Sequence, residues 1–297
     1  MDGVVNVRKT AGPTSHDVVA DMRRIFGQKR VGHAGTLDPM ATGVLVVCLG
    51  KATRIVEYLV GTAKEYRALI RLGVTTDTQD SSGELLTETD ASGVTFEALN
   101  QAAKSFVGEI EQVPPMISAI KHEGKALYKL ARQGLTIERA PRPVSIYSID
   151  VGDLGSGDVA EAELVVRCSS GTYIRTLCAD IGEALGCGAV MSGLERTRVG
   201  RFAADRAVTV DQLREAQAED RLADHVTTMS EALDEMPAIR IDESGMSRAL
   251  HGLPIQTLDA DAVGTVRLLS PSGELVAIAT ADAGVVKPRK VLLDAEA

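Results

Sequence analysis

Two segments of this chain alternate apolar and polar side chains along their length, and this pattern constrains the fold more than any other feature. Residues 65–72 (EYRALIRL) place aromatic and aliphatic side chains on one face and Glu65, Arg67 and Arg71 on the other. Residues 159–168 repeat the alternation. A strand of this kind has one buried and one solvated face, which is typical of antiparallel sheets. We therefore expect a largely antiparallel sheet.

Helical spacing of apolar residues occurs between the strands, without a repeating strand-helix-strand unit. The spacing predicts helices over residues 15–26, 53–60, 95–107, 125–133 and 174–185, and the acidic stretch 205–235 is also predicted to be helical. This irregular order predicts an α+β fold, a mixed, largely antiparallel sheet with flanking helices.

The C-terminal end of the chain has a pattern of its own. Two short β-like runs, 265–269 and 275–279, flank the sequence Ser-Pro-Ser-Gly, which has turn chemistry. This predicts a hairpin in a small β-rich module. Because Pro237 marks a boundary before it, we expect two domains, residues 1–235 and 236–297.

Composition excludes several classes of protein. The longest uncharged run, residues 39–50, is shorter than the roughly 20 apolar residues of a membrane-spanning helix. The N-terminus lacks the pattern of a secretory signal, so we expect a cytoplasmic protein without membrane contact. The four cysteines form no C-x-x-C pair and the five histidines lack ligand spacing, so the sequence predicts neither a disulfide nor a metal site.

Charge is unevenly distributed along the chain, although its formal net value is −9. Residues 1–76 carry eleven basic and six acidic side chains, and residues 121–142 carry six basic and two acidic ones. Residues 205–243 carry eleven acidic side chains against four arginines. These segments are either ordinary solvated faces or a basic nucleic-acid surface opposite an acidic one.

The densest candidate for chemistry is residues 32–43 (GHAGTLDPMATG). Pro39 disfavours helical backbone at Asp38, and the glycines allow close approach to a ligand. Asp38 is therefore either a nucleophile or base on a shaped loop, or a carboxylate that only braces a turn. His33 either polarises a substrate or has a structural role, since no nucleophile or metal site accompanies a His33 and Asp38 pair.

A second candidate is the segment from Arg167 to Arg175, which runs from a strand through Ser-Ser-Gly-Thr into a helix. Arg175 lies in the first helical turn, where a cation opposes the helix dipole. A compensating carboxylate or phosphate is expected beside it, and the alternative is an exposed surface arginine. Residues 112–121, with their Pro-Pro pair, and Lys9 are weak signals by themselves.

These clusters, in this order, resemble the bacterial tRNA pseudouridine synthase B family, whose members isomerise the T-loop uridine of tRNA. The resemblance rests on four segments: residues 32–45 (GHAGTLDPMATGVL), 64–84 (KEYRALIRLGVTTDTQDSSGE), 112–134 (QVPPMISAIKHEGKALYKLARQG) and 169–182 (SSGTYIRTLCADIG). They extend over roughly the first 200 residues, so the signal is specific.

The resemblance implies roles for individual residues. Asp38 would be the catalytic aspartate, Arg175 its pairing arginine, Tyr66 the aromatic that packs on the target base, and His33 a residue that helps to extrude the base. Substrate-binding positions would be Lys9, Lys64, Lys121, Lys125, Lys129 and Arg132. The resemblance further implies uridine 55 of the tRNA T-arm as the substrate, a PUA-like C-terminal domain that binds RNA, a monomer, and no cofactor or metal.

The chemistry agrees with these roles. Pseudouridine formation breaks the C1′–N1 bond and joins C5 to C1′, which needs an ionised carboxylate, an accessible base and little water. Arg175 beside Asp38 would favour the charged carboxylate, and a flipped base would stack on Tyr66. Two alternatives stay open: an RNA-binding or RNA-folding module in which Asp38 is structural, and a hydrolase that uses His33 with Asp38.

Overall fold

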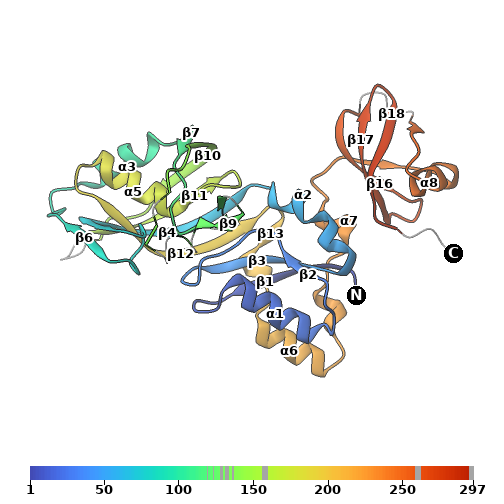
Figure 1. Cartoon of the computed structure of the whole chain (residues 1–297), viewed down its shortest axis with the longest axis horizontal. Coiled ribbons are helices and arrows are strands. Elements are labelled where there is room, and N and C mark those ends of the chain that lie inside the picture. Colours follow the sequence, from blue (N-terminus) through green and yellow to red (C-terminus); the bar gives the residue numbers. More distant parts are fainter. Residues whose placement is uncertain are drawn as a thin grey trace.

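The computed structural model describes residues 1–118, 120–122, 124–127, 130, 134–135, 137–155, 160–257 and 262–293. Within them, the largest sheet has the strand order β1-β3-β12-β4-β11-β10-β7, with β2 beside β3 and β13 beside β12 (Figure 1). Its strands are β1 (Gly3–Lys9), β2 (Val31–His33), β3 (Thr42–Leu49), β4 (Lys64–Leu72), β7 (Gly108–Gln112), β10 (Arg142–Val151), β11 (Glu161–Cys168), β12 (Ala189–Val199) and β13 (Phe202–Ala203). The pairs are antiparallel except β3 with β12, so the prediction of a mixed, largely antiparallel sheet is confirmed.

The two alternating segments are neighbouring central strands. Residues 65–72 lie in β4, and β11 begins at Glu161, two residues later than the pattern suggested. Their antiparallel register places Tyr66 opposite Val166 and Ala68 opposite Leu164. These four side chains belong to one buried cluster, which explains the alternation.

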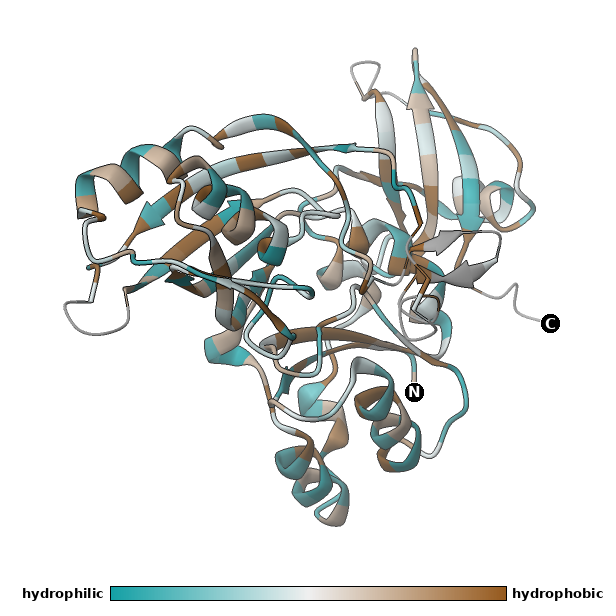
Figure 2. Cartoon of the chain, turned by 60° about the vertical axis from the view of Figure 1, so that its left-hand side comes forward, coloured by the Kyte–Doolittle hydropathy of each residue, from teal (hydrophilic) through white to brown (hydrophobic). Residues whose placement is uncertain are grey.

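Helices cover the sheet in two groups (Figure 1). Helix α3 (Phe96–Lys104) and helix α5 (Ile174–Ala184) pack on the cluster that contains β4 and β11. Helix α1 (Ser15–Ile25) and helix α6 (Val210–Ala218) lie side by side below β1 and β3. Figure 2 shows hydrophilic and hydrophobic residues alternating along the helical ribbons, as expected for helices with one buried face. No helix in the described ranges has the length and hydropathy needed to cross a membrane.

Three predicted helices differ from the structure. Residues 53–60 begin as a 3-10 helix, η1 (Gly50–Ile55), and continue as α2 (Val56–Val60). The stretch 205–235 is broken into η2 (Ala204–Arg206), α6, η3 (Leu222–His225) and α7 (Met229–Ala232). Each α-helix there restarts at a threonine N-cap with a reciprocal capping bond, so the acidic run holds separate helix starts and not one helix.

The helix predicted over 125–133 is wrong at its start. Lys125–Ala126 form strand β9, which pairs with β8 (Lys121–His122) across a turn at Gly124. Gly124 has a φ of +83°, a conformation that favours glycine and allows this tight reversal. Leu127 and Leu130 are helical as predicted, and residues 128–129 and 131–133 of the predicted helix lie outside the described ranges.

The C-terminal part forms a second sheet with the order β14-β16-β17-β18-β15. Its elements are β14 (Ala238–Arg240), α8 (Glu243–Leu250), β15 (Ile255–Gln256), β16 (Gly264–Leu269), β17 (Leu275–Asp282) and β18 (Val285–Val291). The predicted hairpin is confirmed, since β16 and β17 pair antiparallel around a turn in which Ser270 and Glu274 are hydrogen-bonded. A further hairpin, β5 (Val74–Thr76) with β6 (Leu85–Glu88), extends from β4.

Candidate active site

Asp38 lies on the loop between β2 and β3, and neighbouring contacts hold this loop. Leu37 is buried, and both its backbone groups bind Ser15: the Leu37 N–H donates to Ser15 Oγ at 2.9 Å, and Ser15 Oγ donates to the Leu37 carbonyl at 3.0 Å. Ala41 donates its N–H to the Asp38 carbonyl and closes a turn. The Asp38 side chain is 36% exposed, so a tethered backbone presents a reachable carboxylate.

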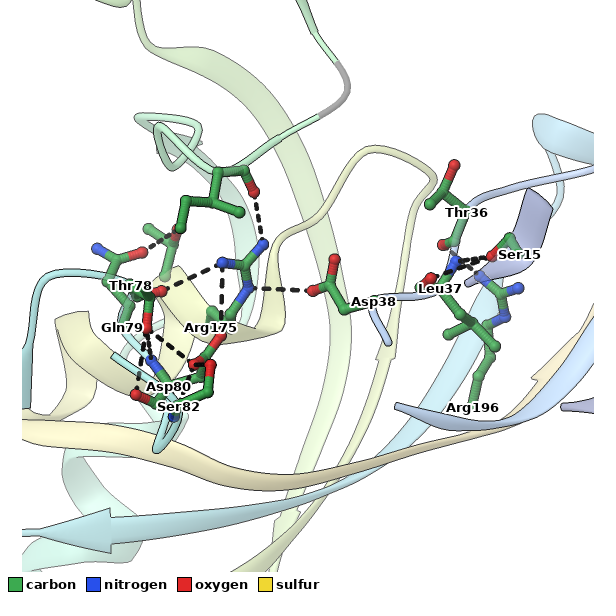
Figure 3. A network of polar contacts seen from close by, with 12 residues as sticks. Ser15, Thr36, Leu37, Asp38, Thr78, Gln79, Asp80, Ser82, Arg175 and Arg196 are labelled. Atoms are coloured by element: carbon green, nitrogen blue, oxygen red, sulfur yellow. Dashed lines mark hydrogen bonds and ion pairs between the residues drawn. The ribbon is translucent and has the colours of Figure 1, made fainter. Parts of the chain in front are cut away.

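Arg175 pairs with that carboxylate from the first turn of α5 (Figure 3). Its Nε lies 3.1 Å from Asp38 Oδ2, and its Nη1 lies 3.6 Å from Asp80 Oδ2. The guanidinium also donates to the carbonyls of Thr78 and Ile117. The Arg175 side chain is only 5% exposed, so the alternative of an exposed surface arginine is wrong. Two carboxylates compensate a buried cation that opposes the helix dipole.

Gln112, which precedes the Pro-Pro pair, fixes the start of α5. Gln112, at the end of β7, accepts a hydrogen bond from the Tyr173 N–H at 3.0 Å and donates to the Tyr173 carbonyl at 3.3 Å. Tyr173 is the N-cap of the helix and has no side-chain cap of its own. Gln112 therefore satisfies backbone groups at the helix start and fixes the turn that carries Arg175.

A pocket of about 260 Å³ opens beside Asp38. Its lining includes Tyr66, Lys64, Arg175 and Arg196 together with residues 170–174. Tyr66 is buried and its pKa is raised, mainly by burial. The pocket thus brings together a carboxylate, an aromatic ring and buried cations from four separate segments of the chain.

Lys9 and Lys64 hold backbone near the pocket. Lys9 Nζ donates to the carbonyls of Thr10, Pro39 and Ala41, and the last two belong to the turn that begins at Asp38. Lys64 Nζ donates to the carbonyls of Val60 and Thr62, each at 2.8 Å. Burial lowers the pKa of each lysine to about 8. In this structure, therefore, both ammonium groups bind the protein's own carbonyls.

His33 lies at the end of β2 and is not among the described residues that line the pocket. Its ring packs edge-on against His16 with 5.9 Å between centroids. Its pKa is lowered, first by burial and then by the charges of His16 and Arg196. Its Nδ1 is buried without a hydrogen-bond partner in the described structure. The geometry does not bring the His33 ring into contact with the Asp38 carboxylate.

The remaining predicted substrate-binding residues cannot be placed at the site. Lys129 and Arg132 lie outside the described residues. Lys121 and Lys125 belong to the β8 and β9 hairpin, and only their backbone is described. In the described ranges there is no group of three His, Cys, Asp or Glu side chains that could hold a metal ion.

Two residues of the site were missed by sequence reasoning. Asp80 stands in the segment 64–84, and the need for negative charge beside Arg175 was the signal that could have identified it. Arg196 lies two residues after Leu194 in β12, and both residues line the pocket. No signal in the sequence identifies Arg196, because the register of β12 with β3 and β4 brings it to the site.

Comparison with known proteins shows the family of the chain. Residues 23–174 match the TruB family pseudouridylate synthase (N terminal domain), and residues 175–234 match the tRNA pseudouridylate synthase B C-terminal domain. The tRNA pseudouridine synthase B of Geotalea uraniireducens (strain Rf4) is 44% identical over 288 residues, which is 95% of this chain and 92% of that protein. That of Clostridium perfringens (strain 13 / Type A) is 47% identical over 243 residues, with 82% and 81% covered.

A solved structure extends the similarity to nearly the whole fold. The chain of a Cbf5-Nop10-Gar1 complex that it resembles matches with a TM-score of 0.77 and 31% identity, over 98% of this chain and 85% of that chain. The family matches and the curated relatives agree on one activity, the formation of pseudouridine in tRNA. The chain therefore belongs to the tRNA pseudouridine synthase B family, and it is an isomerase.

Proposed function

We propose that this enzyme isomerises uridine 55 in the T-loop of tRNA to pseudouridine, with Asp38 as its catalytic carboxylate and without a cofactor. The observation that carries the proposal is the ion pair of the pocket-facing Asp38 with the buried Arg175. The reaction requires an ionised carboxylate, and the Arg175 guanidinium is the countercharge beside it. Membership of the family supports tRNA as the substrate.

The reaction needs little beyond a carboxylate and a shaped pocket. The C1′–N1 bond breaks, the base turns, and C5 joins C1′; the hydrogen on C5 leaves as a proton and N1 gains one. Asp38 either attacks C1′ or accepts the C2′ proton, and both routes begin from its ionised form. Because the reacting atoms are hidden in a folded loop, the nucleotide must be flipped out, and Tyr66 offers a ring for the base to stack on.

We propose that binding involves both parts of the chain. Basic side chains of residues 121–142 would contact phosphates and set the position of the T-arm. Residues 236–297 would form the PUA-like RNA-binding domain; the match to the tRNA pseudouridylate synthase B C-terminal domain ends at residue 234, and a separate sheet follows. A similar solved structure, of an H/ACA RNP bound to a substrate RNA, supports RNA as the ligand of this fold.

We also propose an oligomeric state and a cellular location for the enzyme. We propose that the enzyme acts as a monomer. Because the substrate is tRNA, we propose the cytoplasm as the site of action.

The test is tritium release from a tRNA transcript labelled at uridine C5, since formation of the C5–C1′ bond must expel that hydrogen. We expect release by the wild type and by Asp90→Asn, whose exposed carboxylate lies outside the pocket. Asp38→Asn should bind tRNA and release no tritium. Turnover by Asp38→Asn would remove Asp38 from its role, and release from a transcript without uridine 55 would refute the proposed position.

A further inference from the structure

Arg196 is an internal cation of β12 that contacts the Asp38 loop from the side away from Arg175 (Figure 3). Its residue is 1% exposed. The guanidinium donates to three backbone carbonyls: Nε to Val44 at 2.8 Å, Nη2 to Gly35 at 3.0 Å and Nη1 to Thr36 at 3.3 Å. Two of these carbonyls belong to the loop that leads to Asp38, and the third lies on β3, which follows it.

This arrangement is costly for stability. In the part of the chain that the structure describes, no carboxylate forms an ion pair with Arg196. A buried cation without a paired anion has lost hydration that carbonyl dipoles only partly replace. The charge of Arg196 also contributes to the lowered pKa of the nearby Lys9, Lys64 and His33. A well-packed apolar residue would avoid these costs, so stability alone does not account for an arginine here.

The backbone of β12 at Arg196 lies very close to the backbone of β3. Arg196 pairs with Gly43 of β3 on one side and with Tyr66 of β4 on the other. The register with β4 shifts between Arg196 and Arg198, and such a bulge re-aims the side chains beside it. Gly43 has a φ of +99°, and a Cβ there would lie 2.2 Å from the Arg196 carbonyl oxygen. The glycine and the bulge together set where the guanidinium meets the loop.

We propose that Arg196 is a positioning residue for the isomerisation, which holds the Asp38 loop in a fixed position at the pocket that Tyr66 also lines, through the carbonyls of residues 35, 36 and 44. The inference rests on the proposed role of Asp38. Arg175 orients the carboxylate itself, whereas Arg196 fixes the backbone from which it projects. Arginine suits this role because its planar fork presents donors in several fixed directions, which the single ammonium of lysine cannot do.

Another buried arginine provides a matched control. Arg267, in β16, also donates to three backbone carbonyls, those of Met236, Ser230 and Asp234, but it lies in the C-terminal sheet and away from the pocket. Arg267→Lys therefore removes the same kind of carbonyl contact without touching the Asp38 loop. Comparison of the two variants separates positioning of the catalytic group from general support of the fold.

The experiment measures the single-turnover rate, the Kd for the tRNA transcript and the Tm for the wild type, Arg196→Lys, Arg196→Gln, Arg267→Lys and Asp38→Asn. Arg196→Gln keeps one donor and removes the buried charge, which makes it the variant with less risk to folding. We expect the rate at saturating enzyme to fall at least about tenfold in both Arg196 variants, because a small displacement of a reacting group has a large effect on rate. The Kd should stay within about twofold, since phosphate contacts dominate affinity.

Comparison of the Arg196 variants with Arg267→Lys decides whether a loss of rate comes from the position of the Asp38 loop or from lower stability. Arg267→Lys should lower the Tm, because its buried guanidinium holds only the backbone carbonyls of residues 230, 234 and 236. Its single-turnover rate should equal that of the wild type, because this rate is measured at saturating enzyme and does not depend on the affinity of the C-terminal domain for tRNA. A wild-type rate in both Arg196 variants, with Asp38→Asn inactive, would overturn the inference and leave the proposed function intact. An equal loss of rate in Arg267→Lys would also overturn it, because the effect would then follow from stability. Turnover by Asp38→Asn would instead overturn the proposed role of Asp38, and this inference with it.

Discussion

At the scale of single residues, four buried cations of the described structure lie near the Asp38 loop and its pocket and make different contacts. Arg175 is the one that pairs with Asp38 directly. Lys9, Lys64 and Arg196 bind backbone carbonyls that surround the loop and the pocket. The loop that carries Asp38 is thus held in position by backbone contacts, and its carboxylate has one buried countercharge.

The lysine pKa values predict a pH dependence of stability. Burial lowers the pKa of Lys9 from 10.5 to about 8, an effect opposed by the charge of Asp38 and reinforced by that of Arg196. Between these two values the unfolded chain holds a proton at Lys9 that the folded protein has lost, so stability rises with pH across that window. The Tm of the wild type minus that of Lys9→Met should therefore increase from pH 7.5 to pH 10, and a decrease would contradict the burial effect.

The sequence predicted a carboxylate beside Arg175 but not the role of Arg196. The expected anion beside Arg175 follows from local physics, because a cation in a first helical turn requires compensation, and the structure provides Asp38 and Asp80. Arg196 could not be found in this way. Its partners lie about 150 residues earlier in the chain, and only the register of β12 with β3 brings them together.

At the scale of elements, the parallel pairing of β3 with β12 depends on Gly43. Alanine there would bring a Cβ within 2.2 Å of backbone and would occupy a φ of +99°. We expect Gly43→Ala to lower the free energy of unfolding by about 2–3 kcal/mol, measured by urea denaturation, because neither strand can yield without breaking the sheet. Gly93→Ala, which meets open space, should stay within about 0.5 kcal/mol of the wild type. Equal effects of the two changes would show that the close approach does not matter.

Strands and helices were predicted best where a single spacing of apolar residues continues along the whole element. Strands β4 and β11 follow from alternation, and α1 and α5 from apolar spacing that ends at a clear stop. The sequence did not predict the breaks in the 205–235 stretch. Its composition favours one continuous helix, whereas the capping bonds of Thr209 and Thr228 start separate helices. The spacing of apolar residues does not predict which strands are neighbours. The strand register that brings the pocket residues together could therefore not be predicted from the sequence.

At the scale of the whole molecule, the two parts of the chain share a core. One buried cluster contains Val44 and Val46 of the large sheet together with Leu275, Ile278 and Leu292 of the C-terminal part. Polar contacts support the same junction, since Lys290 pairs with Glu57 and its ammonium lies 5.5 Å from the Tyr58 ring centroid. The division at residue 235 is therefore a boundary in topology but not in packing.

This shared core predicts cooperative unfolding of the whole chain. Calorimetry of the wild type should show one thermal transition, because separation of the two sheets would expose the apolar cluster between them. Leu292→Ala should shift that single transition as a whole, with a loss of about 2–4 kcal/mol in the free energy of unfolding. Val266→Ala is the control variant, because Val266 lies in the separate core of the C-terminal sheet and not in the shared cluster. Two resolved transitions, of which Leu292→Ala moved only one, would show instead that the domains unfold independently and that the cluster adds little to their association.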